Sequence, residues 1–222
     1  MNLPLNLHSF LGNVLIFLPM LLSLTVHEFA HAWSAYQLGD DTAARAGRMS
    51  LNPIVHIDVL GTLILPLLGV PFGWAKPVPV NPVRFNHKHS MATGMMITAA
   101  AGPLSNVLLA ILSTVALGIL MRVAPAAVQF DTPFGRLLWL MIEINVVLAL
   151  FNLIPIPPLD GSRIVDGLMP YRWRGAWERF SALAPFLLVA VIIFGGVLLS
   201  GPEAWAMSLV QRLLTVIAPA AV

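Results

Sequence analysis

Four long apolar runs constrain the fold of this chain more than any other feature. They cover about residues 10–38, 91–122, 134–154 and 182–200. Each reaches the roughly 20 residues that a helix needs to cross a bilayer. The chain is 58% hydrophobic and 10% charged, against roughly 45–50% and 25% in a soluble domain. We therefore predict an all-α polytopic membrane protein that folds as a single domain over residues 1–222, with a weakly amphipathic helix over about 203–217 as a further candidate.

Cysteine content and charge exclude several classes of partner and site. The chain contains no cysteine, so neither a disulfide framework nor a thiolate metal site can form. Its formal net charge is only +2, and no basic cluster points to nucleic acid. The lipid bilayer is the partner that the composition predicts.

The region between the first two apolar runs has a mixed character. Residues 54–70 are apolar but short, and polar and helix-breaking residues interrupt them, so they could either span the membrane or enter it and return. Residues 72–85 carry three prolines, which exclude a helix and suit an edge strand or an extended loop. We expect a re-entrant helix and β-loop region, which must be buried in protein or line a wet cavity because its backbone is irregular.

Ionisable residues inside the first apolar run indicate a functional site, because such side chains are costly in hydrocarbon. His27 and His31 are spaced i, i+4, so on a helix both imidazoles project from one face and can bind one metal ion. Glu28 lies about 100° round the helix from His27, where it can hold a metal-bound water. This is the HExxH arrangement of zinc hydrolases.

A third metal ligand is expected, because a catalytic zinc usually takes three protein ligands and leaves a fourth position for water or substrate. The candidates are His56, Asp58, His87, His89, Glu143 and Asp160. Asp160 is the strongest candidate, since three prolines between residues 155 and 158 end the preceding helix and Gly161 permits a turn. His87 and His89 lie in a polar loop, where a solvated turn is the simpler interpretation.

The run 91–122 carries one face of small residues. Gly94, Thr98, Gly102 and Asn106 recur every four residues and therefore share a helical face. Such a face lets another backbone approach closely, and plain helix packing is the favoured interpretation. Asn106 could in addition form a hydrogen bond into the active site.

Two motifs together resemble the site-2 protease family of intramembrane zinc metalloproteases, in its small bacterial type. They are HEFAH at residues 27–31 and the pattern Asn152-x-x-Pro155-x-Pro157-x-x-Asp160-Gly161. The segments AAAGPLSN (99–106) and GWAKPVPVNP (73–82) also resemble parts of such proteins. The resemblance covers most of residues 20–165. It implies that His27, His31 and Asp160 bind one Zn2+ per chain, that Glu28 is the general base, and that Asn152 steadies the substrate carbonyl.

The same resemblance implies an enzyme that hydrolyses peptide bonds in or near transmembrane segments of membrane proteins, with its catalytic core at about residues 10–165. A substrate helix must unwind locally, because its backbone is hydrogen-bonded internally. An edge strand over residues 74–80 could bind the freed groups by strand addition. A metal-ion transporter and a non-catalytic membrane scaffold are the alternatives, and the oligomeric state is left open.

A shared metal ion constrains the topology. HEFAH lies near the C-terminal end of the first run and Asp160 lies just beyond the run 134–154, so these two helices must run in the same direction. Residues 39–90 must then return to the side where they began. Nine Lys and Arg residues then fall on one side, against three (Arg122, Arg136 and Arg212) on the other. The positive-inside rule makes the first side cytoplasmic, which predicts a multi-pass protein of the cell membrane with its active site toward the cytoplasm.

Overall fold

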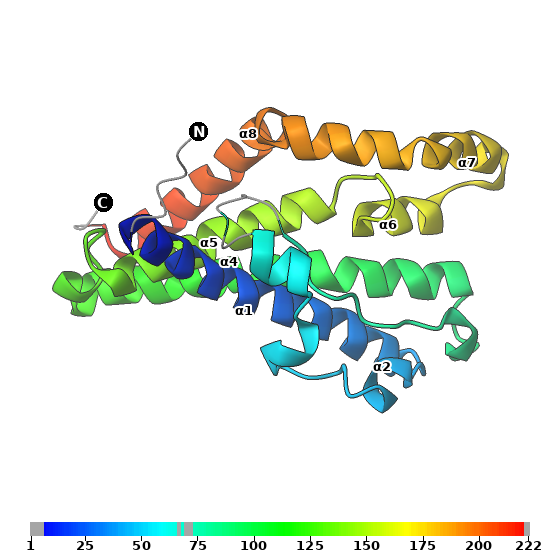
Figure 1. Cartoon of the computed structure of the whole chain (residues 1–222), viewed down its shortest axis with the longest axis horizontal. Coiled ribbons are helices and arrows are strands. Elements are labelled where there is room, and N and C mark those ends of the chain that lie inside the picture. Colours follow the sequence, from blue (N-terminus) through cyan, green and yellow to red (C-terminus); the bar gives the residue numbers. More distant parts are fainter. Residues whose placement is uncertain (1–6, 66–67, 69–72, 220–222) are drawn as a thin grey trace.

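The structure is a computed structural model that describes residues 7–65, 68 and 73–219, with side chains described from residue 16 onward. Within these residues every regular element is a helix and none is a strand, which confirms the predicted all-α class. The four long helices are α1 (Leu7–Gln37), α4 (Met91–Val123), α5 (Pro133–Asn152) and α8 (Ala184–Ile217). Figure 1 shows α1 and α5 running in one direction and α4 and α8 in the other.

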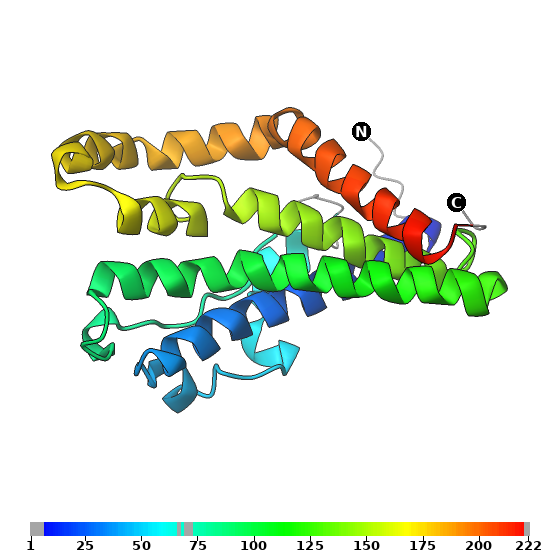
Figure 2. The same cartoon turned by 180° about the vertical axis from the view of Figure 1, so that it is seen from behind.

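Eight shorter elements of the described chain connect or flank the long helices. Between α1 and α4 these are α2 (Thr42–Arg45), η1 (Pro53–His56), η2 (Val59–Ile64) and η3 (Pro82–Arg84). After α4 they are η4 (Pro125–Ala127), α6 (Asp160–Leu168), η5 (Tyr171–Trp173) and α7 (Arg174–Ala182). The helix α4 packs against α1, α5, α6 and α8, and the view from behind shows it lying between α1 and α5 (Figure 2). It is therefore the central helix of the bundle.

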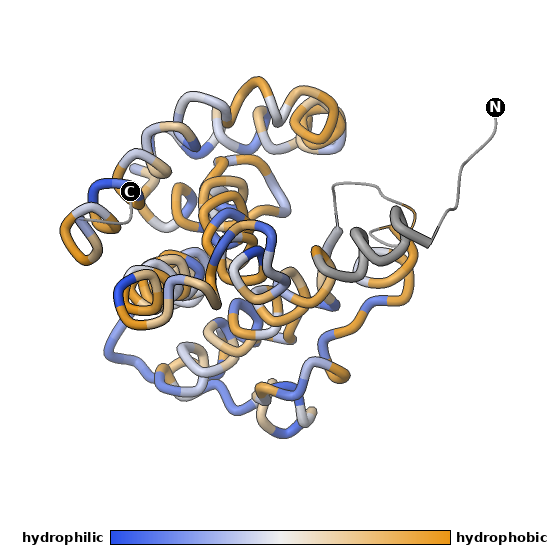
Figure 3. The backbone as a smooth tube through the Cα atoms, turned by 90° about the vertical axis from the view of Figure 1, so that its left-hand side faces the viewer, coloured by the Kyte–Doolittle hydropathy of each residue, from blue (hydrophilic) through white to orange (hydrophobic). Residues whose placement is uncertain are grey.

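Three helices of the described chain, α4, α5 and α8, are long and apolar enough to cross a membrane. The prediction of a membrane protein with several spans is therefore confirmed. The helix α1 is 31 residues long, and its membrane span is a prediction from its apolar sequence. Figure 3 shows hydrophobic residues along the helices and hydrophilic residues gathered in the connecting segments.

Polar caps and prolines set the start of two long helices. The Ser90 hydroxyl accepts a hydrogen bond from the Thr93 backbone N–H at the start of α4. The Thr132 hydroxyl accepts one from the Gly135 N–H at the start of α5, where Pro133 is the first helical residue. Both arrangements satisfy backbone donors that a helix leaves free in its first turn.

The structure corrects the prediction for the C-terminal region. The sequence predicts a span over about 182–200 and, as a further candidate, a separate weakly amphipathic helix over about 203–217. The chain instead forms one 34-residue helix that contains Pro202. Figure 1 shows a bend in α8 where its colour passes from orange to red. The proline therefore bends the helix, as an internal proline commonly does, and does not end it.

The region between α1 and α4 is irregular, as expected. The six-residue π-helix η2 is too short to cross a bilayer, although part of the predicted stretch, 66–67 and 69–70, lies outside the described residues. Residues 73–81 are extended but belong to no strand among the described residues, so of the two predicted conformations they adopt the loop. Pro77 and Pro79 lack the backbone N–H that a sheet ladder uses.

Hydrogen bonds fold this extended segment back on the chain before it. The Trp74 N–H donates to the Gly61 carbonyl (3.3 Å), and the Lys76 N–H donates to the His56 carbonyl (2.9 Å). Further on, the Asn86 N–H donates to the carbonyl of Leu38 (2.6 Å). Residues 38–86 therefore form an excursion that begins and ends beside the C-terminal end of α1.

Candidate metal centre

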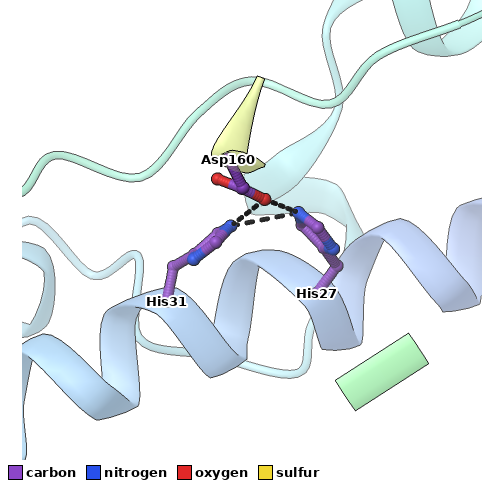
Figure 4. Close-up of side chains that lie close together, drawn as sticks. All are labelled: His27, His31 and Asp160. Atoms are coloured by element: carbon purple, nitrogen blue, oxygen red, sulfur yellow. Dashed lines mark hydrogen bonds and ion pairs between the residues drawn. The ribbon is translucent and has the colours of Figure 1, made fainter. Parts of the chain in front are cut away.

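The two histidines of HEFAH and Asp160 converge at one point in the bundle (Figure 4). His27 and His31 are buried on one face of α1, and Asp160 is the first residue of α6. The two Nε2 atoms lie 3.0 Å apart, and Asp160 Oδ2 lies 3.2 Å from the Nε2 of His27 and 3.3 Å from that of His31. The i, i+4 spacing and the turn before Asp160 thus place three ligand-type atoms in a small triangle.

The partners of the other imidazole nitrogens determine what these three atoms can do. Nδ1 of His27 lies 2.7 Å from Asn106 Oδ1, and Nδ1 of His31 lies 2.7 Å from the Thr98 carbonyl oxygen. Both contacts are to acceptors, so each Nδ1 carries the proton and each Nε2 presents a lone pair. Asp160 Oδ2 is buried and finds no hydrogen-bond donor among the described residues.

A cation between them would stabilise three acceptor atoms that face one another. Zn–N and Zn–O bonds of about 2.0–2.1 Å at tetrahedral angles place the ligand atoms about 3.3–3.4 Å apart. The observed separations of 3.0, 3.2 and 3.3 Å are close to that spacing. The residues present therefore fit a metal ion, and two neutral imidazoles with one carboxylate form a donor set suited to zinc.

The small-residue face of α4 holds the two histidines. Thr98 and Asn106 supply the acceptors for the Nδ1 protons, and Gly102 lies between them on the same face. A Cβ added at Gly102 would lie 2.5 Å from His31 Cε1 and Nε2 and 2.6 Å from His27 Cε1. The face therefore does more than the plain helix packing that the sequence favoured, because Asn106 also forms the hydrogen bond into the site that the sequence offered as an addition.

The turn after α5 positions Asp160. The chain leaves α5 at Asn152 and re-enters a helix at Asp160. A Cβ added at Gly161 would overlap the Leu153 carbonyl group, so glycine allows α6 to begin in contact with this turn.

Glu28 and Asn152 lie outside the three-atom cluster. The buried Glu28 carboxylate accepts a hydrogen bond of 2.8 Å from the Val78 N–H, so the extended segment 73–81 contacts this residue directly. Asn152 is the last residue of α5, and its side-chain amide donates to the Leu148 carbonyl (3.0 Å). In this conformation the Asn152 amide is occupied within its own helix.

The other five candidates for the third ligand do not join the cluster. His56 is buried, with its Nε2 2.7 Å from the Ser50 carbonyl oxygen. Asp58 caps η2 by accepting hydrogen bonds from the Leu60 and Gly61 N–H groups. His87 and His89 are exposed and Glu143 is half-buried on α5. Of the six candidates, Asp160 alone contacts the histidine pair.

Sequence reasoning missed two buried polar residues near the site. Asn145 on α5 and Ser23 on α1 have no exposed surface and form a hydrogen-bonded chain with Asn106. The available signal was an asparagine in the middle of an apolar run, since a polar side chain in a transmembrane helix tends to face the bundle interior.

Comparison with known proteins identifies the family. The model of the family described as "Peptidase family M50" matches residues 118–195. "Putative zinc metalloprotease YwhC" of Bacillus subtilis is 44% identical over 169 residues, which cover 75% of this chain and 72% of the relative. "Putative zinc metalloprotease Rip2" of Mycolicibacterium smegmatis is 30% identical over 190 residues, which cover 81% of this chain and 66% of the relative. No solved structure matches.

The prediction of zinc as the cofactor agrees with the names of both relatives and with the His27, His31 and Asp160 cluster. The predicted family is confirmed by the identity and coverage of the Bacillus relative. The chain belongs to Peptidase family M50, the site-2 protease family of zinc metalloproteases.

Proposed function

We propose that this protein is an intramembrane zinc metalloprotease that cleaves peptide bonds in or near transmembrane segments of membrane proteins. The observation that carries the proposal is the triangle of His27 Nε2, His31 Nε2 and Asp160 Oδ2, buried among helices long enough to span a bilayer. In this proposal these three atoms hold one Zn2+ per chain. When bound, zinc lowers the pKa of a coordinated water and polarises a substrate carbonyl.

Glu28 is the proposed general base. It is the neighbour of a metal-binding histidine, it is buried, and its carboxylate lies outside the metal cluster. It takes the proton of the attacking water and delivers it to the leaving amine. Asn152 is the proposed donor to the substrate carbonyl, and a change of rotamer would release its amide from the Leu148 carbonyl.

The extended segment 74–80 is the proposed binding site for an unwound substrate. Its Val78 N–H already contacts Glu28, so a peptide lying along this segment would pass beside the proposed base. An unwound helix has free backbone N–H and C=O groups that need partners at membrane depth. Pairing along an extended segment supplies such partners. The N–H groups of Trp74, Lys76 and Val78 are already hydrogen-bonded, so the segment would offer the substrate mainly its carbonyl groups.

We further propose four spans (α1, α4, α5 and α8), a re-entrant region over residues 54–90, and an active site toward the cytoplasmic side of the cell membrane. The parallel course of α1 and α5 in Figure 1 supports this topology. The hydrogen bond between the Asn86 N–H and the Leu38 carbonyl supports it as well. The nine-to-three distribution of Lys and Arg then gives the orientation.

A pair of matched substitutions tests the proposed activity. Glu28→Gln retains size and shape but removes the base, so cleavage of a single-span test substrate should fall by about 10²–10⁴-fold while bound zinc is retained. Glu143→Gln makes the same change on α5, outside the metal cluster, and should cleave at the parental rate. Near-parental cleavage by Glu28→Gln would exclude the proposed mechanism, and metal uptake into vesicles that depends on Glu28 would favour the transporter.

A further inference from the structure

A chain of buried hydrogen bonds runs from His27 across three helices. Nδ1 of His27 lies 2.7 Å from Asn106 Oδ1, and Asn106 Nδ2 donates to Asn145 Oδ1 (2.8 Å). Asn145 Nδ2 donates in turn to the Ser23 hydroxyl (2.8 Å) and to the Met141 carbonyl (2.7 Å). The exposed fractions are 4% for His27 and 0% for Asn106, Asn145 and Ser23. This series of hydrogen bonds thus joins α1, α4 and α5 and returns to α1, entirely within the bundle.

Each amide in this chain has one orientation that satisfies its contacts. If the Asn145 amide were flipped, its oxygen would face the Met141 carbonyl and its NH2 group would face that of Asn106. If the Asn106 amide were flipped, its oxygen would face the Asn145 Oδ1 atom, which is also an acceptor. Either change sets like groups against each other in a buried place, where an unsatisfied polar group costs about 1–3 kcal/mol. The Met141 carbonyl, which can only accept, therefore orients Asn145, and the Ser23 hydroxyl accepts a second hydrogen bond from the same NH2 group. Asn145 in turn orients Asn106.

The direction of this chain determines which nitrogen of His27 is available. With Asn106 Oδ1 facing it, the His27 proton lies on Nδ1, and Nε2 presents its lone pair toward His31 and Asp160. We propose that Asn145 and Ser23 are positioning residues of the metal centre, which act through Asn106 to hold His27 in this tautomer and ring orientation. This inference rests on the proposed metal site and adds two residues that lie outside its motifs.

His31 provides an internal reference for the proposal. Its Nδ1 faces the backbone carbonyl of Thr98, which no side-chain substitution in the chain of hydrogen bonds removes. Changes at Asn145 or Ser23 should therefore affect His27 and leave the tautomer of His31 as it is. A general loosening of the bundle would instead affect both histidines.

The test uses the full-length protein in detergent or nanodiscs, with four substitutions. Asn145→Leu removes the acceptor for Asn106, whereas Asn145→Asp keeps an oxygen that accepts from Asn106 in either protonation state. Ser23→Ala removes one of the two acceptors of the Asn145 NH2 group. Thr114→Val is the control, because Thr114 is equally buried on α4 but donates only to the Ala110 carbonyl of its own helix.

Two measurements distinguish positioning from folding. The first is zinc affinity by chelator competition, together with the visible spectrum of the Co2+-loaded protein. The second is the tautomer of each imidazole in the metal-free protein, from 15N spectra of histidine-labelled samples. Asn145→Leu should weaken zinc binding by about 10–100-fold, the range for residues that orient a metal ligand, and give mixed tautomers at His27 alone. Asn145→Asp should show the single tautomer of the parent. Ser23→Ala should change the tautomer populations of His27 less than Asn145→Leu does, and Thr114→Val should match the parent.

The inference would be overturned if Asn145→Leu and Ser23→Ala both bind zinc with the parental affinity and both keep a single Nδ1–H tautomer at His27. If Asn145→Leu does not fold, the comparison of zinc affinity and His27 tautomer between Ser23→Ala and Thr114→Val decides the outcome. The proposed metal site is tested separately by His27→Ala. If His27→Ala retains its full zinc content, the metal site itself is contradicted. If His27→Ala loses zinc while the Asn145 and Ser23 variants bind it as the parent does, only the positioning role is contradicted.

Discussion

The two ends of the bundle are held together in different ways, although α4 and α5 contribute to both. At one end, Leu117, Val128, Ile142, Val210 and Leu214 form an apolar cluster. Toward the other end, two smaller apolar clusters accompany a polar one, in which buried groups of α1, α4, α5 and α6 contact one another at hydrogen-bond distances around the His27, His31 and Asp160 triangle. Apolar packing depends on volume and tolerates exchange of similar side chains, whereas a polar cluster depends on the direction of each bond. Substitutions at the two ends should therefore separate stability from metal binding.

The largest effect on the polar end is expected from Asp160→Ala. It removes one of three proposed ligands, so the loss of zinc affinity should exceed the roughly 10–100-fold typical of residues that only orient a ligand. Activity should be lost with the metal. Zinc content and cleavage of a single-span substrate, measured on the same preparation, check this. Zinc content equal to the parent would transfer the ligand role to another candidate, such as His56 or Glu143.

The apolar end should respond to Ile142→Ala in stability alone. Ile142 has no exposed surface, and truncating such a side chain costs about 2–5 kcal/mol of folding free energy. Thermal unfolding in detergent should therefore shift strongly downward, while zinc affinity of the folded protein stays at the parental value. A large loss of zinc affinity would show that the two ends are not independent.

Gly102→Ala tests the close approach of α4 to the histidines. The added methyl group would contact both imidazoles, and overpacking of this kind costs about 1–3 kcal/mol. Both stability and zinc affinity should fall. Gly195→Ala on α8 is the matched control, because a Cβ there meets no atom within 4 Å. The contrast would be refuted by equal zinc affinity in the two variants.

The smallest perturbation is the introduction of single cysteines, which tests the proposed orientation without altering either end. The chain has no native cysteine. His87→Cys should be labelled by a membrane-impermeant reagent from the cytoplasmic side, and Gln129→Cys from the opposite side. Both positions are exposed. Labelling of both from the same side would overturn the proposed topology.

Much of the fold and the proposed ligand set could be predicted from the sequence, because both depend on local patterns. Apolar runs of sufficient length predicted α4 and α5, and the i, i+4 histidines with the proline-rich turn before Asp160 predicted the cluster. The continuous helix α8 was mispredicted, since Pro202 is locally unfavourable but the helix continues beyond it. Local propensity alone could not establish that outcome.

The series of hydrogen bonds behind His27 could not be predicted from local sequence patterns, for a different reason. Asn106 and Asn145 are 39 positions apart in the sequence, and Asn145 and Ser23 are 122 apart. No short pattern links residues at such separations, so the sequence offered only isolated polar residues in apolar helices. For Asn106, packing was the favoured interpretation, and the structure adds its hydrogen bond to His27.

The central claim, that His27, His31 and Asp160 hold one zinc, is tested most directly by X-ray absorption spectroscopy of the purified protein with its metal content measured in parallel. The account predicts one zinc per chain, with imidazole scattering from two histidines and nitrogen or oxygen donors at about 2.0–2.2 Å. His31→Ala should remove one imidazole contribution or the metal altogether. A protein that cleaves its substrate without zinc, or whose zinc spectrum shows no imidazole, would contradict the claim.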